Sequence, residues 1–299
     1  MSPVYVTGAS GLLGHAVAAD LARRGRNVVA VTRRPLPGPA PEGLRVALTA
    51  APLVPDWARH TDATIVHFAG LSRVAHGFGD WAELERAEIG PQGAMLDGLR
   101  ARGWRGHMVY VSSAAVYGPA KRLPLSEDDP LDAATDYGRQ KIAMEAAHAI
   151  AAQAGGWPLT VLRVANPYGA TEGPRDRGVI PLVVAAARTG ARFTANGTGR
   201  EMRDYLHMDD LRAAFRAVID APPEPGTARV LNLGSGIGTT LPELIARVEA
   251  ATGRRIDWRL APAEVASNVL SVARIDRVLG WSPRVTLADG IARMVAGSA

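Results

Sequence analysis

The feature that most constrains the fold of this chain is a glycine-rich turn within residues 4–14, Val-Tyr-Val-Thr-Gly-Ala-Ser-Gly-Leu-Leu-Gly. A short β-rich run precedes its three glycines, and apolar residues at helical spacing follow them. The pattern predicts a strand, a tight turn and a helix. Gly8 permits the turn, Gly11 lets a phosphate approach the backbone, and Gly14 lets the helix pack close to the strand. The helix N-terminus then offers N–H groups to a pyrophosphate.

This turn predicts a dinucleotide site. A plain glycine-rich turn between a strand and a helix is the alternative, but the strand before and the helix after are the context that the dinucleotide fingerprint requires. We assign six residues of the turn to the cofactor: Gly8, Ser10, Gly11, Leu12, Leu13 and Gly14.

The end of the second predicted strand, residues 27–31, bears on the choice of cofactor. It falls about 20 residues past the turn, where an acidic residue would hold the ribose 2′-hydroxyl of NAD. Here the residues are Thr32, Arg33 and Arg34. Arginine suits a 2′-phosphate through paired, charge-assisted hydrogen bonds. We therefore predict NADP(H), with NAD(H) as the other possibility; two solvated surface arginines are the structural alternative.

The rest of the chain predicts an α/β fold with a parallel, doubly wound Rossmann sheet, because strands and helices alternate. We expect strands at 44–48, 63–70, 107–113 and 160–165, a helix over 80–103 broken at Gly90-Pro91, and a helix from Asp136. Later elements are helices at 180–188, 210–219 and 240–251 and a strand at 230–233. We expect a dinucleotide-binding domain at 1–166 and a smaller α/β substrate lobe at 167–299, with parts of the chain crossing back.

Ser113, Tyr137 and Lys141 are the candidate catalytic residues. Tyr137 and Lys141 lie four apart on one predicted helix, hence on one face, and Ser113 ends a strand. Oxidation or reduction of a carbinol carbon moves a proton at its oxygen; a phenol of pKa near 10 becomes a better base beside an ammonium. Each residue alone also fits an ordinary structural role. Yet Lys121 and Lys141 are the only lysines among 34 basic residues. This favours a role for Lys141 that depends on the chemistry by which lysine differs from arginine.

Seven motifs together resemble the extended short-chain dehydrogenase/reductases, in the group of nucleotide-sugar epimerases, dehydratases and reductases. The resemblance spans essentially the whole chain, through residues 7–14, 67–71 (His-Phe-Ala-Gly-Leu), 111–118 (Val-Ser-Ser-Ala-Ala-Val-Tyr-Gly), 137–141 (Tyr-Gly-Arg-Gln-Lys), 162–169 (Leu-Arg-Val-Ala-Asn-Pro-Tyr-Gly), 203–211 (Arg-Asp-Tyr-Leu-His-Met-Asp-Asp-Leu) and 279–283 (Leu-Gly-Trp-Ser-Pro).

The resemblance and the strand ends together imply further site residues. Asn166 and Arg203 would contact the diphosphate of a nucleotide sugar; the alternatives are a turn asparagine and a structural Arg–Asp pair. The other expected substrate residues are Ser72, Ser113, Ala114 and Val179. Those expected to line the cofactor are Leu48, Phe68, Ala69, Gly70, Val111, Val164, Tyr137 and Lys141.

Departures from the family pattern narrow the activity. Sugar 4,6-dehydratases carry Thr-Asp-Glu where this chain has Ser113-Ala114-Ala115, so dehydration is not expected. The family's acidic residue near adenine is replaced around Leu48, and its fourth-helix asparagine appears as Glu88. The family's second arginine of the pyrophosphate site is not evident near residues 259–264, and Arg259 is the candidate to take its place.

Three functions follow, in this order. The first is NADPH-dependent reduction of a 4-keto group on a nucleotide-activated sugar, favoured by Arg33, the Ser/Tyr/Lys triad and the absent dehydratase acids. The second is a 4-epimerase with tightly held NAD, favoured by residues 67–71 and 203–211. The third is a non-catalytic NADP-binding protein, because a fold alone does not give a function.

Composition excludes several other classes. The 299 residues contain no cysteine, so disulfides and thiolate chemistry are absent, and no apolar run approaches the ~18 residues of a membrane span. The net charge of +5 comes without a basic cluster interleaved with aromatics, which argues against nucleic acid. Because the first strand starts almost at Met1, we expect no signal peptide. We expect a cytoplasmic homodimer that binds neither metal, membrane nor nucleic acid and acts on a small nucleotide sugar.

Overall fold

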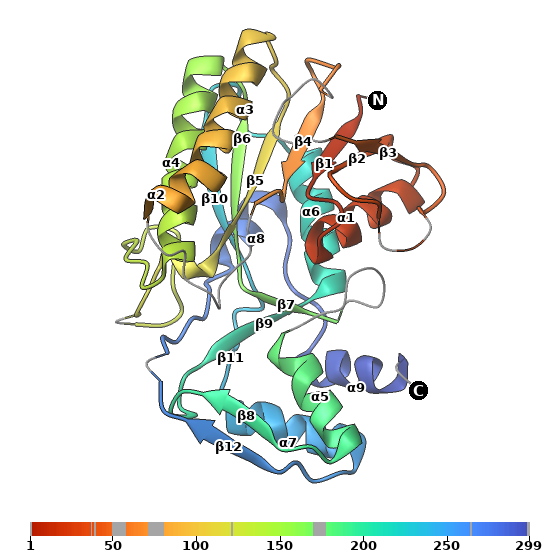
Figure 1. Ribbon diagram of the computed structural model, residues 1–299, viewed down its shortest axis with the longest axis vertical. Helices are drawn as coiled ribbons and strands as arrows, with labels where there is room; N and C mark the ends of the chain where they lie inside the picture. The colour runs from red at the N-terminus through yellow and green to blue at the C-terminus, as the bar shows by residue number, and fades with distance from the viewer. Residues whose placement is uncertain are drawn as a thin grey trace.

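The computed structural model describes residues 2–36, 38, 40–49, 58–70, 81–120, 122–169, 178–263 and 265–297. A large sheet flanked by helices forms its upper half in Figure 1, and short strands with three helices form the lower half. No helix in these ranges is long and apolar enough to cross a membrane.

The large sheet has seven strands in the order β10-β6-β5-β4-β1-β2-β3, and every neighbouring pair is parallel. The strands are β1 (Val4–Thr7), β2 (Val28–Thr32), β3 (Leu44–Leu48), β4 (Thr64–His67), β5 (Met108–Ser113), β6 (Leu159–Val164) and β10 (Ala228–Leu233). The chain runs outward from β1 to β3 and returns to β4 beside β1. This is the predicted doubly wound topology, and ligands of such sheets bind where the strand order reverses, beyond the strand C-termini.

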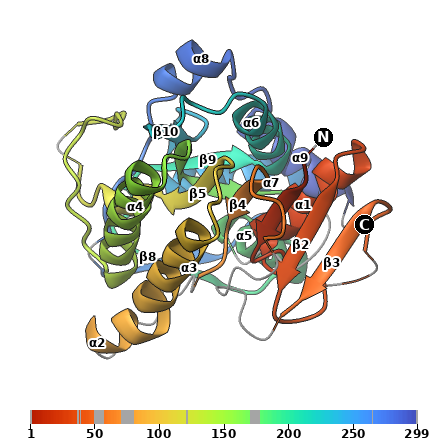
Figure 2. The ribbon, with the colours of Figure 1, turned by 90° about the horizontal axis from the view of Figure 1, so that it is seen from above.

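Helices cover both faces of the sheet, as the view from above shows (Figure 2). On one face, Val17 and Phe215 share a core with Val6; on the other, Met95 and Met144 share a core with Tyr5. Because neighbouring strand residues point to opposite faces, β1 is buried on both sides. The helices of the first face are α1 (Leu12–Arg23), α6 (Met208–Asp220) and α8 (Ala273–Leu279), and those of the second are α3 (Gly90–Ala101) and α4 (Asp136–Gly155).

The predicted break near Gly90-Pro91 takes the form of a π-helical turn. Helix α2 (Trp81–Leu84) passes into the π turn η2 (Glu85–Ile89), which leads directly into α3. Pro91 has no N–H to donate to a carbonyl of the preceding turn, so regular α-helical bonding cannot pass through it. Residue 80, where the helix was expected to begin, lies outside the described residues. The register change turns Glu88 inward, where it is 6% exposed.

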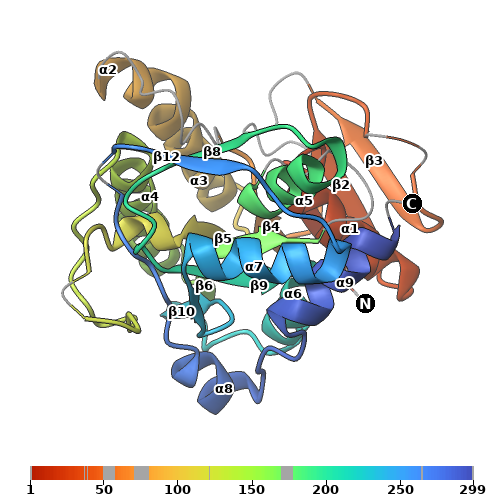
Figure 3. The ribbon, with the colours of Figure 1, turned by 90° about the horizontal axis from the view of Figure 1, so that it is seen from below.

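The lower half contains strands too short to be predicted from periodicity (Figures 1 and 3). One sheet joins β7 (Asn166–Tyr168), β9 (Arg203–His207) and β11 (Gly238–Thr239), and a parallel pair joins β8 (Phe193–Asn196) and β12 (Trp258–Ala261). The described helices there are α5 (Val179–Thr189), α7 (Leu241–Thr252), which begins with a capping box, and α9 (Leu287–Gly297). Helices α6 and α8 and strand β10 come after residue 166 in the chain but belong to the upper half. The division into two domains near residue 166, with parts of the chain crossing back, stays a proposal.

The expected strand at 63–70 ends earlier than predicted. Strand β4 stops at His67, and the next residues form a loop, because the Ala69 N–H donates to Thr7 Oγ1 (3.3 Å) and not to a neighbouring strand. Phe68, Ala69 and Gly70 therefore follow the strand end.

Candidate active site

The three glycines of the N-terminal turn are required by close backbone contacts. Gly8 has a φ of 69°, and a Cβ there would lie 2.8 Å from the Ala69 nitrogen. A Cβ on Gly14 would lie 2.5 Å from the Gly8 carbonyl oxygen. The Gly11 N–H donates to that same oxygen (2.9 Å). Any side chain at Gly8 or Gly14 would force the turn away from β4 or α1.

The start of α1 suits an anion. Gly11 is the N-cap and supplies no side-chain cap, and the first turn holds no acidic residue. The helix dipole and its first N–H groups therefore keep their attraction for negative charge. Ser10, Leu12 and Leu13 lie half-buried at the same turn. This arrangement fits the pyrophosphate of a dinucleotide, and the assignment of the individual residues stays a prediction.

The end of β2 presents two exposed arginines. Thr32 is buried, and its Oγ1 donates to the Arg34 carbonyl (2.9 Å). This contact fixes the turn and leaves the side chains of Arg33 and Arg34 in solvent. Within the described residues neither arginine forms an ion pair. Leu48, at the end of edge strand β3, is 62% exposed.

The loop after β4 lies beside the glycine turn. Phe68 packs on Phe215 of α6, with ring centroids 5.1 Å apart, and Gly70 is exposed. Ser72, expected to touch the substrate, lies outside the described residues. The Val164 side chain is buried at the end of β6.

Ser113, Tyr137 and Lys141 come together at the C-terminal edge of the large sheet. Ser113 ends β5, while Tyr137 and Lys141 lie on the first turns of α4. The Lys141 ammonium donates to the Val111 carbonyl (2.9 Å) and to the Tyr110 hydroxyl (3.4 Å). It lies 5.8 Å from the centroid of the Tyr137 ring. The triad predicted from separate motifs is therefore one cluster.

The protein alone does not lower the pKa of Tyr137 as we expected. Burial raises that pKa, and a hydrogen bond with Ser113 opposes the rise. Removing the phenol from water penalises its charged form more than the hydrogen bond with Ser113 favours it. Ser113 also accepts from the Ala115 N–H at the following short helical turn (3.2 Å), and Ala114 beside it is buried.

Lys141 has a strongly perturbed environment. Burial lowers its pKa to about 8, while the carboxylates of Glu88 and Glu145 oppose the change. A buried amine whose pKa is lowered this far is typical of a functional site.

A buried cluster of aromatic and histidine side chains lies behind Lys141, and no motif of the sequence predicted it. His148 stacks on Tyr110 at 4.1 Å between ring centroids, and His67 lies 5.7 Å from His148. The Nδ1 of His67 is hydrogen-bonded to Thr7 Oγ1 (2.8 Å). Burial lowers the pKa of both histidines, that of His148 to about 4. Both rings are therefore neutral near pH 7 and add no charge beside Lys141.

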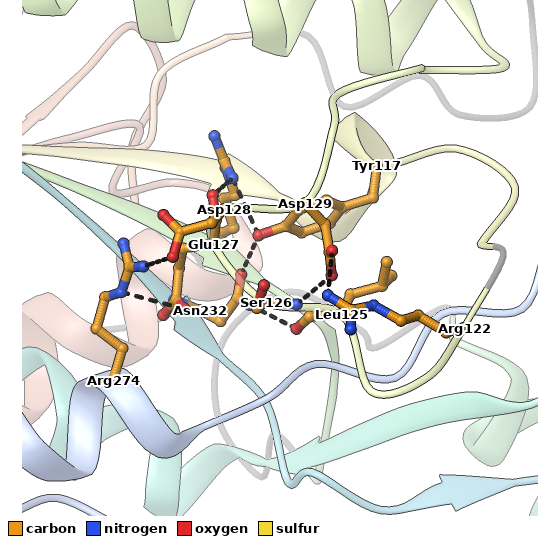
Figure 4. A network of polar contacts seen from close by, with 10 residues as sticks. Tyr117, Arg122, Leu125, Ser126, Glu127, Asp128, Asp129, Asn232 and Arg274 are labelled. Atoms are coloured by element: carbon orange, nitrogen blue, oxygen red, sulfur yellow. Dashed lines mark hydrogen bonds and ion pairs between the residues drawn. The ribbon is translucent and has the colours of Figure 1, made fainter.

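The segment between β5 and α4 is fastened to β10 and α8 by polar contacts (Figure 4). Glu127 accepts from the Asn232 N–H (2.8 Å) and pairs with Arg274 (3.4 Å). Arg274 also donates to Asp128. The Tyr117 hydroxyl donates to the Asn232 side chain (2.6 Å). These contacts fix the loop that leads into Tyr137.

A buried ion pair underlies the same loop. Arg163 of β6 and Glu145 of α4 approach to 2.7 Å with both side chains less than a tenth exposed. Ser112 donates to Glu145 (2.5 Å), and Arg163 donates to the Tyr117 hydroxyl (3.0 Å). The pair therefore connects α4 to the sheet.

A cavity of about 230 Å³ lies between β7, β8, β9 and the start of α5, and it contains three of the predicted substrate residues. They are Asn166, Val179 and Arg203, and Glu201 and Tyr205 line it with them. Ser113 pairs in register with Val164, two residues before Asn166, so β6 leads directly from the sheet edge that carries the triad to the wall of this cavity.

Among the described residues, Arg203 forms no ion pair with an aspartate, the structural pair that was its alternative interpretation. It donates to the Ala266 carbonyl, and the neighbouring Asp204 accepts from Ser235, Gly236 and Leu270. Asn166 donates to the Asp204 carbonyl (2.8 Å).

Arg259, the expected substitute for a second pyrophosphate arginine, lies on β12, and its role stays a prediction. It is exposed and donates to Thr194 (3.2 Å), and it is not among the residues that line the cavity. The described residues contain no cluster of three or more His, Cys, Asp or Glu side chains that could hold a metal ion.

Comparisons with known proteins agree with this geometry. The model of the NAD dependent epimerase/dehydratase family matches residues 4–234. A UDP-glucose 4-epimerase of Corynebacterium glutamicum is 32% identical over 240 residues, covering 74% of this chain and 71% of that protein. One of Rhizobium leguminosarum bv. trifolii is 30% identical over 313 residues, covering 96% and 94%. Among solved structures, MoeE5 in complex with UDP-glucuronic acid and NAD has a TM-score of 0.88 and 27% identity, covering 100% of this chain and 99% of that one.

Proposed function

Because the chain belongs to the NAD dependent epimerase/dehydratase family, whose members include the enzymes compared above, we propose that it is a nucleotide-sugar 4-epimerase. The observation that carries this proposal is the cluster of Ser113, Tyr137 and Lys141 at the C-terminal edge of the large sheet, where β6 ends two residues before Asn166 of the cavity wall. The relatives named above are UDP-glucose 4-epimerases, so a UDP-hexose is the proposed substrate.

The dinucleotide, which we propose to be NAD, would lie over the glycine turn. The α1 N-terminus would take the pyrophosphate, and the loop at Phe68, Ala69 and Gly70 would lie under the cofactor together with Val111 and Val164. When bound, NAD supplies a reversible hydride acceptor and a positive charge. The uncapped helix start and the close-packed glycines support this placement.

Tyr137 is the proposed acid and base. Its phenolate takes the proton from the 4-hydroxyl of the sugar as C4 is oxidised to a ketone. Its phenol returns that proton after the ketone presents its other face. The Lys141 ammonium, 5.8 Å from the ring, favours the phenolate. Ser113 holds the substrate oxygen by hydrogen bonding.

The cavity of the lower half is the proposed nucleotide site. Arg203 supplies its cation for the diphosphate, and Asn166 and Val179 shape the wall beside it. Ala114 stands where a dehydratase would place an acid, so the keto intermediate keeps its neighbouring hydroxyls.

One observation favours a second candidate, the NADPH-dependent ketoreductase that the sequence analysis placed first. Arg33 and Arg34 are exposed at the strand end where a 2′-phosphate would lie, and no carboxylate follows Thr32. The compared proteins support the epimerase and do not support the reductase or a preference for NADP. The homodimer and the cytoplasmic location remain predictions from the sequence.

The two candidates differ in what they need from solution. An epimerase returns the hydride to its substrate, so it retains its cofactor and turns over without added reductant. We expect the purified protein, denatured and extracted, to release near-stoichiometric NAD, and the native protein to convert UDP-glucose to UDP-galactose unaided. A cofactor-free protein that consumes NADPH only with a keto sugar would establish the reductase instead.

A further inference from the structure

Ser112 is the residue at the end of β5 to which the proposed reaction gives no role. It is 3% exposed, and its hydroxyl donates to Glu145 Oε1 of α4 (2.5 Å). Arg163 of β6 holds the same carboxylate, with its Nε 3.1 Å from Oε1 and a terminal nitrogen 2.7 Å from Oε2. Glu145 is itself buried. One carboxylate therefore joins β5, β6 and α4 through charge-assisted hydrogen bonds.

Glu145 shares its face of the helix with the two catalytic residues of α4. Tyr137, Lys141 and Glu145 recur every four residues, so they form one stripe along the helix. The stripe faces the end of β5, because each of its members contacts that strand. Tyr137 is hydrogen-bonded to Ser113, Lys141 donates to the Val111 carbonyl, and Glu145 accepts from Ser112. Three successive turns of α4 thus hold the three consecutive strand residues 111–113.

The contact at Ser112 bears on how Ser113 and Tyr137 lie relative to each other. Ser113 is the next residue on β5, and Tyr137 lies two turns before Glu145, about 12 Å along the axis of α4. A helix that is tied to a strand at two points one turn apart can neither slide along the strand nor rotate about its own axis. The contacts of Lys141 and Glu145 are two such points. Loss of the one at Ser112 therefore loosens the placement of Tyr137.

We propose that Ser112 is a positioning residue, which holds the phenol of Tyr137 and the hydroxyl of Ser113 at the separation that the sugar hydroxyl requires. This rests on the proposed function in so far as Tyr137 and Ser113 are the groups that meet the 4-hydroxyl of the sugar. Ser112 acts through Glu145 and α4 and touches neither the sugar nor the transferred proton. A misplacement of about 1 Å in an active site costs roughly 100-fold in rate.

Removal of the Ser112 hydroxyl leaves the rest of the network in place. Glu145 keeps its bonds to Arg163, so Ser112→Ala leaves no buried charge without its partner. The variant should therefore fold and lose only the stability of one buried hydrogen bond. The cavity with Asn166 and Arg203 lies in the lower half of the molecule. The KM for UDP-glucose should therefore stay unchanged, and the loss should appear in kcat.

Four variants separate positioning from a purely structural role. Ser112→Ala removes the hydroxyl, and Ser112→Thr and Ser112→Val add side chains of the same shape that differ in the hydroxyl. Thr160→Val is the matched control for a lost buried hydroxyl. Thr160 lies near the start of β6, away from the strand C-termini, and it is fully buried. Its Oγ1 is hydrogen-bonded to His107 (2.9 Å) and Arg229 (3.1 Å).

In the epimerase assay we expect Ser112→Ala to lower kcat by about 10- to 100-fold. Ser112→Thr should retain at least about ten times the kcat of Ser112→Val, because only the threonine side chain can donate to Glu145. Thr160→Val should lower the melting temperature, as Ser112→Ala does, but leave kcat unchanged. An unchanged kcat in Ser112→Ala, equal kcat values in Ser112→Thr and Ser112→Val, or an equal loss in Thr160→Val would overturn the proposal.

A spectroscopic measurement tests the positioning without turnover. Protein labelled with ¹³C at the tyrosine Cζ gives six resonances, and the one that disappears in Tyr137→Phe belongs to Tyr137. In the cofactor-free protein this resonance should move in Ser112→Ala and keep its place in Ser112→Thr, with Tyr168 and Tyr205 of the lower half as references. A Tyr137 resonance that does not respond to Ser112→Ala would overturn the proposal. A wild type without epimerase activity would instead refute the proposed function, and the resonance would still decide whether Ser112 positions Tyr137.

Discussion

Replacing His148 by phenylalanine should weaken the dependence of stability on pH below neutrality. The imidazole is fully buried and stacks on Tyr110 at 4.1 Å. Its Nδ1 is hydrogen-bonded to the Met144 carbonyl (2.8 Å), while no described residue accepts a hydrogen bond from Nε2. A second proton on the ring would therefore be buried without an acceptor.

The size of the effect follows from the pKa of His148. Burial, with the nearby charge of Lys141, lowers it from 6.5 to about 4 against the opposing bond to Met144. Between these two values the unfolded chain binds a proton that the folded chain does not, so stability falls as pH falls. For one such histidine the free energy of unfolding drops by about 2 kcal/mol between pH 7 and pH 5. Phenylalanine keeps the ring stacking and removes that drop.

Urea denaturation at pH 7 and pH 5 measures the difference. We expect the wild type to lose about 2 kcal/mol more than His148→Phe over this interval. His60→Phe is the matched control, because His60 is exposed, and it should follow the wild type. Identical losses in wild type and His148→Phe would show that His148 does not titrate with a lowered pKa in the folded protein, and the reasoning would fail.

Three further substitutions test other parts of the site. Glu145→Gln should cost about 3–5 kcal/mol in urea denaturation, because it leaves the buried Arg163 charge without its partner; a loss under 1 kcal/mol would contradict this. Lys141→Met should abolish turnover. The melting temperature of the cofactor-free variant in calorimetry should not fall, because folding lowers the pKa of Lys141, so its charge destabilises the folded protein. On the second candidate, the ketoreductase, Arg33→Ala should weaken NADPH binding at least about tenfold and spare NADH in tryptophan-quenching titrations, because it would remove one charge-assisted hydrogen bond to the 2′-phosphate. An equal loss for both cofactors would remove Arg33 from 2′-phosphate recognition.

The local parts of the site were predictable from the sequence because local chemistry determines them. Gly8 and Gly14 are needed wherever a strand turns directly into a close-packed helix, so their spacing predicts the turn. Tyr137 and Lys141 lie one turn apart on any helix. The strands of the large sheet were equally predictable. Helices cover both faces of that sheet, so its strands appear in the sequence as continuous apolar runs.

The long-range parts were not predictable. His67 and His148 lie on different elements and meet only after β4, β5 and α4 pack together. Glu88 seemed only a departure from the family, and its burial follows from the π turn before Pro91. The small strands of the lower half span two to five residues, too short for a period to show. The direction in which the Tyr137 pKa shifts also needed the structure, because it depends on how deeply the phenol is buried.

The central claim, epimerisation with the hydride returned to the same sugar, is tested most directly with UDP-glucose deuterated at C4. The purified protein, without added cofactor, should produce UDP-galactose that keeps the deuterium at C4, as read by proton and deuterium NMR. Tyr137→Phe should slow this conversion by at least about 100-fold, the scale of general acid–base catalysis. Absence of the epimer, or an epimer that has lost its deuterium, would contradict the account.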